Sequence, residues 1–143
     1  MKIVCANCEV QSDYNVSEEG CYSFTCPDCE MEFDATIGTT RSKRSRGHKP
    51  SLSREYSIRF FQNELENFLQ FESNVYEDVE LRSKDIFVIS SLDGVPRILA
   101  NLNIQKYWVI NTKRSETNDA AVMTTVLILV FAGLIIAALI SSS

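Results

Sequence analysis

The sequence predicts a small multi-part protein: a zinc ribbon with four cysteine ligands, a small antiparallel β domain of the SH3-like or OB-like barrel kind, and one C-terminal transmembrane helix. Two CxxC pairs lie near the N-terminus, short alternating apolar segments fill the middle of the chain, and an uncharged apolar run follows near the end. In chain order we expect a ribbon over 1–37, a basic flexible linker over 38–53, the β domain over 54–111, a juxtamembrane segment over 112–119 and the transmembrane helix over 120–140.

The cysteine pattern predicts a metal site. Four of the five cysteines form the pairs Cys5/Cys8 and Cys26/Cys29, with seventeen residues between the pairs. Each CxxC pair can turn into a knuckle that directs two thiolates at one ion, and two knuckles complete a tetrahedral site. Structural Zn²⁺ is the favoured ion. Rubredoxin-type iron and redox chemistry are the alternatives, whereas disulfides would need an oxidising compartment.

The surroundings of the two pairs carry a family resemblance. The strand MKIV leads into the first knuckle, a polar connection follows at Tyr14–Val16, the strand YSFT leads into CPDC, and Phe33 comes after it. With these features residues 1–37 resemble the short N-terminal zinc ribbons of many bacterial and archaeal proteins. In this chain Glu9 and Glu30 stand where those ribbons usually have glycine. The resemblance implies that the four paired cysteines are the ligands and that the ribbon has a structural or partner-binding role.

The sequence predicts no enzymatic activity, because it contains no recognisable set of catalytic residues. A closed site of four cysteines leaves no open coordination position for a substrate. Cys21 is interpreted as a small strand residue, with a spare ligand or redox-sensitive thiol as the alternative. His48 is the only histidine and lies in a basic stretch, where a solvated side chain is expected. The sequence contains no glycine-rich phosphate loop and no Ser-His-Asp set, so we expect a binding protein.

Charge divides the chain. The ribbon carries one basic against eight acidic residues, whereas residues 38–54 carry six basic residues and no acid. Nucleic-acid-binding ribbons need a positive face for phosphate, so nucleic acid is the less favoured partner. The basic stretch is rich in Ser, Thr and Gly and is interpreted as a flexible linker. It is a plain tether, a contact for anionic lipid, or a contact for an acidic protein or nucleic acid. The predicted contact residues are Arg41, Lys43, Arg44, Arg46 and Lys49.

The middle of the chain predicts four to six short strands. Tyr56, Ile58 and Phe60 alternate onto one face, residues 65–71 fit either a strand or a helix, and residues 86–90 form a clear strand. Asp93-Gly94 is a strong signal for a hairpin turn. Because these strands follow one another within a short segment, an antiparallel barrel or sandwich is expected.

The apolar run at 120–140 predicts membrane insertion. A helix of this length spans about 30 Å, the thickness of the hydrocarbon core. Lys113 and Arg114 precede the run and no charge follows it, so the N-terminal part is expected in the cytoplasm. No apolar stretch long enough for a signal peptide occurs near Met1. Gly133 and Ala137 lie four residues apart and are the predicted contact for a partner helix.

These observations predict a non-enzymatic, tail-anchored accessory or scaffold protein with a cytoplasmic zinc ribbon and β domain. It would be a small subunit of a larger membrane complex, or it would recruit a soluble partner to the membrane. Two alternatives remain open: a membrane-tethered regulator that binds nucleic acid through the basic stretch, and a redox or electron-transfer protein that uses the site of the four paired cysteines.

Overall fold

A computed structural model describes residues 1–112, and Met1–Thr112 forms one compact unit. Its regular structure is entirely β, and these residues include no helix long and apolar enough to cross a membrane. The predicted helix over 120–140, with the Gly133/Ala137 contact, lies outside the described residues. The strands are β1 (Lys2–Val4), β2 (Gln11–Asp13), β3 (Gly20–Thr25), β4 (Glu32–His48), β5 (Ser53–Gln62), β6 (Leu65–Ser73), β7 (Ile86–Leu92), β8 (Val95–Asn101) and β9 (Lys106–Val109).

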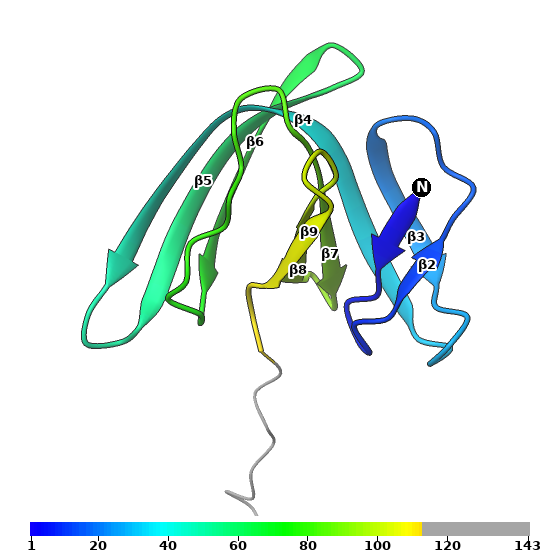
Figure 1. Cartoon of the computed structure of the whole chain (residues 1–143), viewed down its shortest axis with the longest axis horizontal. Coiled ribbons are helices and arrows are strands. Elements are labelled where there is room, and N and C mark those ends of the chain that lie inside the picture. Colours follow the sequence, from blue (N-terminus) through cyan, green and yellow to red (C-terminus); the bar gives the residue numbers. More distant parts are fainter. Residues whose placement is uncertain (113–143) are drawn as a thin grey trace, which may run out of the picture. The chain divides into compact units, whose positions relative to one another are not determined.

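The strands form one small and one large antiparallel sheet (Figure 1). β1 pairs with β2, and the seven-stranded sheet has the order β6-β5-β4-β7-β8-β9, with β3 added to β4. Strand β4 has three partners: its first half pairs with β3 on one edge and β7 on the other, and its second half pairs with β5. A bulge between Thr40 and Ser42 separates the two halves. β4 therefore connects the cysteine-bearing strands with the rest of the sheet.

The long strand β4 corrects the predicted fold class. A separate ribbon joined to a separate small barrel is wrong, because residues 32–48 form one strand that belongs to both parts. Four of the basic residues expected in a linker, Arg41, Lys43, Arg44 and Arg46, lie in β4 instead. The ladder of β4 to β5 runs from Thr39 to His48. Backbone pairing stabilises this strand although its side chains are mostly polar, which is why composition alone suggested a flexible segment.

Two hydrophobic cores lie on opposite faces of β7 and β8. Phe87, Ile89 and Leu99 belong to the first core, which β5, β9 and the segment 74–85 complete. Val88 and Ala100 belong to the second core, which they share with residues of the ribbon. Consecutive residues of a strand point to opposite faces, so strands buried on both sides show the unbroken apolar runs seen at 87–89 and 98–100. The ribbon thus packs directly on the central strands.

The first core is enclosed by a curved sheet whose edges β6 and β9 approach each other without a strand ladder between them in the described part of the chain. Side chains make the connection: Ser73 Oγ donates to the carbonyl of Ile110, and Asn111 Nδ2 donates to the carbonyl of Glu72 at 3.1 Å. The closed SH3-like or OB-like barrel of the prediction is therefore also corrected. The strand predictions for residues 56–60 and 86–90 are confirmed, and residues 65–71 form a strand.

The segment 74–85 crosses the inner face of β4 and β5 and is held there by polar groups. Lys43 Nζ donates to Asp78 Oδ1 at 3.0 Å and to the carbonyl of Val79 at 2.5 Å. The hydroxyl of buried Tyr56 donates to the carbonyl of Glu77 at 3.1 Å. Burial raises the pKa of Tyr56 to about 12, mainly because the phenolate would lose its solvation. Lys43 and Tyr56 thus attach this segment to the sheet.

Candidate metal centre

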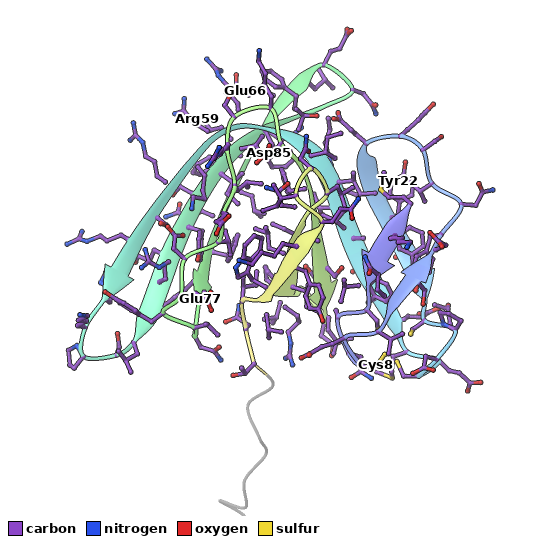
Figure 2. The ribbon with its side chains drawn as sticks, in the orientation of Figure 1. Cys8, Tyr22, Arg59, Glu66, Glu77 and Asp85 are labelled. Carbon is purple, nitrogen blue, oxygen red and sulfur yellow. The ribbon has the colours of Figure 1, made fainter. Side chains whose placement is uncertain are left out.

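The four paired cysteines lie on two similar turns. Cys5 follows β1 directly and Cys26 follows β3, so each strand delivers the first cysteine of a pair to the same end of the ribbon. The second cysteines, Cys8 and Cys29, lie within the turns themselves. Figure 2 shows Cys8 at this end of the molecule, far from Arg59. Two strand ends therefore position four thiols.

Each turn closes with the same two backbone hydrogen bonds. Cys5 N donates to Val10 O at 2.9 Å and Glu9 N donates to Cys5 O at 3.1 Å. In the second turn Cys26 N donates to the carbonyl of Met31 at 3.0 Å and Glu30 N donates to Cys26 O at 2.9 Å. This closure requires a left-handed residue after the second cysteine, and Glu9 and Glu30 have φ values of 63° and 62°. Glycine adopts this conformation without strain, whereas the Cβ of a glutamate makes it costly.

The turns bring the four sulfurs together. Sγ of Cys5 lies 3.8 Å from Sγ of Cys29, and Sγ of Cys8 lies 3.6 Å from Sγ of Cys26. All four sulfurs are within 4.8 Å of one another, and none of the five cysteines forms a disulfide. Cys5 and Cys26 are buried, whereas Cys8 and Cys29 are half-buried. These thiols form a group that could hold a metal ion.

Hydrogen bonds around the cluster favour thiolate at one position. The side chain of Asn7 donates to Cys29 Sγ at 3.4 Å, and its backbone N–H donates to Cys5 Sγ at 3.3 Å. The Asn7 side chain is the main cause that lowers the pKa of Cys29 to about 6. Desolvation instead raises the pKa of Cys8 to about 12 and also raises that of Cys5. A bound cation would stabilise the thiolate form of these cysteines.

Aromatic side chains support the turns from the inside of the ribbon. The rings of Tyr14 and Phe24 lie 4.5 Å apart between centroids, and those of Phe24 and Phe33 lie 5.9 Å apart. Phe33 is buried in the same core as Cys5 and Cys26. The second core therefore carries the thiol cluster on its surface, and the cluster is attached to the main sheet through β4.

The other predicted contact residues do not form one group. Lys43 points to the inner face and pairs with Asp78, and Arg41 pairs with Glu66 at 2.5 Å. Lys49 lies in the turn after β4, with Nζ 5.4 Å from the ring centroid of Tyr76. Only Arg44 and Arg46 are both exposed on the outer face of β4 and without an ion pair among the described residues. The expected basic stretch is thus divided between the two faces of a strand.

Cys21 and His48 lie apart from the thiol cluster. Cys21 is exposed in β3, with Sγ 3.9 Å from Thr36 Oγ1 and 3.7 Å from Gln62 Nε2. His48 ends β4 and places Nε2 3.3 Å from Glu55 Oε2. Neither side chain belongs to a group of metal-ligating residues in the part of the chain that the structure describes.

Sequence reasoning missed three residues. Asn7 donates hydrogen bonds to Sγ of Cys5 and of Cys29. Its polar side chain between Cys5 and Cys8 in the sequence was the signal that could have indicated this contact. Arg59 and Phe68 join Arg44 on the outer face, as described below, but only the pairing of β4, β5 and β6 brings them together.

No protein-family model, no curated protein and no solved structure matches this chain. Its function is therefore inferred from the geometry and the sequence of the chain itself.

Proposed function

We propose that Cys5, Cys8, Cys26 and Cys29 hold one structural Zn²⁺, and that the protein is a non-enzymatic binding scaffold held at a membrane. The observation that carries the proposal is the convergence of the four sulfurs. Four thiolates arranged tetrahedrally around zinc at about 2.3 Å lie about 3.8 Å from one another. The Cys5–Cys29 and Cys8–Cys26 sulfur distances of 3.8 and 3.6 Å fit this spacing.

A structural role follows from the number of protein ligands. Four cysteines fill a tetrahedral zinc site and leave no position for water or a substrate. The ion would join the turn after β1 to the turn after β3, so its binding energy would stabilise the second core. The same donors would also accept iron, for which electron transfer is the corresponding function.

The membrane part of the proposal rests on the sequence of residues 120–140, which is uncharged and mostly apolar. A scaffold held there would act by binding, either as a small subunit of a membrane complex or by recruiting a soluble partner. Lys113 and Arg114 before the apolar run support a cytoplasmic location for residues 1–112.

Metal analysis of the purified full chain tests the proposal. We expect one zinc per chain and no visible absorbance, because zinc has a filled d shell whereas iron–thiolate sites are coloured. Cys26→Ser should lose the metal, and the matched control Cys21→Ser, which changes a thiol outside the cluster, should retain it. A coloured iron protein would support electron transfer, and a metal-free folded protein would contradict both functions.

The scaffold role is tested separately. The full chain, tagged at the N-terminus and extracted in mild detergent, should co-purify with defined partners, and Cys26→Ser should lose those that contact the ribbon. The variants Cys26→Ser and Cys21→Ser should both stay in the membrane fraction, whereas removal of residues 120–140 should release the protein. If the full chain appears in the soluble fraction, the membrane part of the proposal is wrong.

A further inference from the structure

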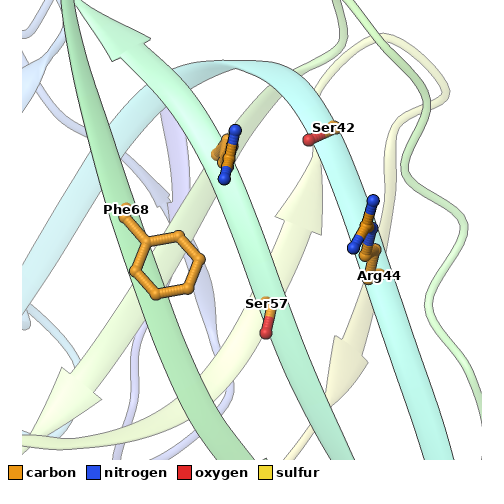
Figure 3. Close-up of a pocket in the computed structure, with 5 residues that line it drawn as sticks. Ser42, Arg44, Ser57 and Phe68 are labelled. Carbon is orange, nitrogen blue, oxygen red and sulfur yellow. The ribbon is translucent and has the colours of Figure 1, made fainter.

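The outer face of β4, β5 and β6 carries a patch that the ribbon and its metal do not use. Its members project from three neighbouring strands and line a depression of about 250 Å³. The residues of this Arg44–Arg59 patch are Ser42, Arg44, Ser57, Arg59 and Phe68. Figure 3 shows Phe68, Ser57 and Arg44 on three different strands around the depression.

The strand register brings the two arginines together. Arg59 lies opposite Ser42 of β4 and opposite Phe68 of β6, and Arg44 lies opposite Ser57. Arg44 and Arg59 are therefore diagonal neighbours on one face, a spacing of about 7–8 Å that lets long side chains interact. Two hydroxyl groups lie beside them. The register thus assembles a compact group of guanidinium and hydroxyl donors.

No ion pair among the described residues compensates the charges of these two arginines, unlike those of Arg41 and Lys43. Arg41 pairs with Glu66 at 2.5 Å, and Lys43 pairs with Asp78 at 3.0 Å. For Arg44 and Arg59 no carboxylate lies within 4.0 Å among residues 1–112. Two positive charges at this spacing repel each other, so an anion bound between the two guanidinium groups would relieve their repulsion.

An exposed aromatic ring borders the same depression. The side chain of Phe68 is 60% exposed although it lies in a sheet next to a well-filled core. A second hollow continues past Arg59 and Phe68 to Glu66 and Asn67. A flat ring could stack on Phe68 there, because aromatic side chains on a sheet face are platforms for unpaired bases.

We propose that the Arg44–Arg59 patch binds one nucleotide unit of a single-stranded nucleic acid, with the two guanidinium groups on the phosphate and Phe68 under the base. Guanidinium forks and hydroxyl groups match phosphate oxygens, and the ring next to them matches the base attached to that phosphate. This inference goes beyond the proposed scaffold function and does not depend on the metal or the membrane.

Carboxylates on both sides limit the patch to about one nucleotide unit. They favour a single-stranded nucleic acid over a lipid surface as the ligand. Glu55 and Glu72 lie opposite each other at one side of the patch, and Glu66 lies at the other. A flat anionic leaflet would meet these carboxylates together with the arginines, which would be repulsive. A single strand can place one phosphate and one base in the depression and turn away from the sheet.

Fluorescence anisotropy of a labelled pyrimidine oligonucleotide tests the proposal with the full chain in nonionic detergent. We expect binding of the single strand that weakens as salt rises, and much weaker binding of the matching duplex, whose bases cannot stack on Phe68. Arg59→Ser and Phe68→Ala should each weaken binding about tenfold. Phe68→Ala should leave competition by inorganic phosphate unchanged, because phosphate contacts only the arginines.

Two matched controls lie elsewhere on the unit. Arg82→Ser removes one exposed guanidinium in the segment 74–85, and Tyr107→Ala removes a 43% exposed ring on β9. Both should bind the oligonucleotide as the wild type does, and all variants should keep their metal content, which reports that they are folded.

Three results would overturn the proposal. They are absence of single-strand binding, equal effects of the patch and control variants, and binding of phosphatidylserine vesicles through Arg44 and Arg59 without oligonucleotide binding. Each of these could occur with the metal and the membrane anchoring intact, so failure here is distinguishable from failure of the scaffold function.

Discussion

Phe60 lies directly over Gly38, so that a Cβ built on Gly38 would stand 2.6 Å from Cδ2 of the ring. The ring in turn packs edge-on against Phe87 at 5.2 Å between centroids. The absence of a side chain at Gly38 in β4 thus leaves the space that the Phe60 ring of β5 occupies in the first core. The glycine that suggested a flexible linker has a packing role.

Gly38→Ala should destabilise the protein by about 1–3 kcal/mol, because the buried Phe60 ring must move out of its position. Urea unfolding measures the loss. The smaller side chain of Phe60→Leu should make room for the methyl group, so Gly38→Ala should cost less in the Phe60→Leu background than in the wild type. Equal costs in the two backgrounds would show that the close approach does not matter.

Glu9→Gly and Glu30→Gly should each stabilise the ribbon by about 0.5–1 kcal/mol. A non-glycine residue pays about 1–2 kcal/mol for the left-handed conformation, and the greater unfolded-state entropy of glycine offsets part of the gain. Thermal unfolding measures the change. Glu9→Ala removes the same charge but keeps a Cβ, so a gain of equal size in this variant would assign the effect to charge and not to backbone strain.

The pair formed by Asp78 and Lys43 should make stability depend on pH in the acid range. Burial alone would raise the pKa of Asp78, but hydrogen bonds from Lys43 and Ser45 and the charges of Lys43 and Arg54 together lower it. A carboxyl with a lowered folded-state pKa adds stability above its unfolded pKa of about 3.9, and this contribution disappears as the pH falls through the folded value.

Asp78→Asn should therefore cost about 1 kcal/mol at neutral pH, a modest value because the Asp78 side chain is 42% exposed. The difference from the wild type should stay constant down to about pH 4 and vanish below it. Urea midpoints of the wild type and of Asp78→Asn over a pH series measure the cost and its pH dependence. Because the two proteins are compared at the same pH, the loss of metal in acid affects both and cancels. A difference that persists unchanged well below about pH 4 would contradict this prediction.

Removal of the metal should weaken the whole unit, because β4 belongs to both cores. We expect a chelator to lower the stability by about 4 kcal/mol or more. The fluorescence of Trp108, which is buried in the first core, should report the same lowered melting temperature as a probe of the ribbon. A chelator already saturated with zinc is the control. If Trp108 melts unchanged, the two cores are independent of each other.

Local features of the fold were predictable from the sequence, and the sharing of a strand was not. CxxC spacing locates the thiol turns, and Asp93-Gly94 locates the β7–β8 hairpin, where both residues have positive φ values. These signals depend on neighbours in the chain. β4 lacks such a signal in its second half, since its inner face meets Asp78 and its outer face meets solvent, so neither shows an apolar alternation.

The candidate sites, too, were predictable only where they depend on residues close together in the chain. The four cysteines were predicted as ligands from their spacing, whereas the patch on the outer face needs the register of three strands. The apolar run at 86–89 predicted the strand β7, and the structure shows that residues of both of its faces are buried. What covers its second face, the ribbon, depends on contacts between residues far apart in the chain, such as Ile3 and Val88.

Because the seventeen residues of β4 are common to the ribbon and the curved sheet, the two cannot be exchanged independently. A gene fragment that ends after Ile37 would remove the β5-pairing half of the strand, and one that begins at Arg54 would leave the edge of β7 without its partner. Recombination within this region would thus yield aggregation-prone edges. The ribbon and its sheet thus form one unit that cannot be divided within β4.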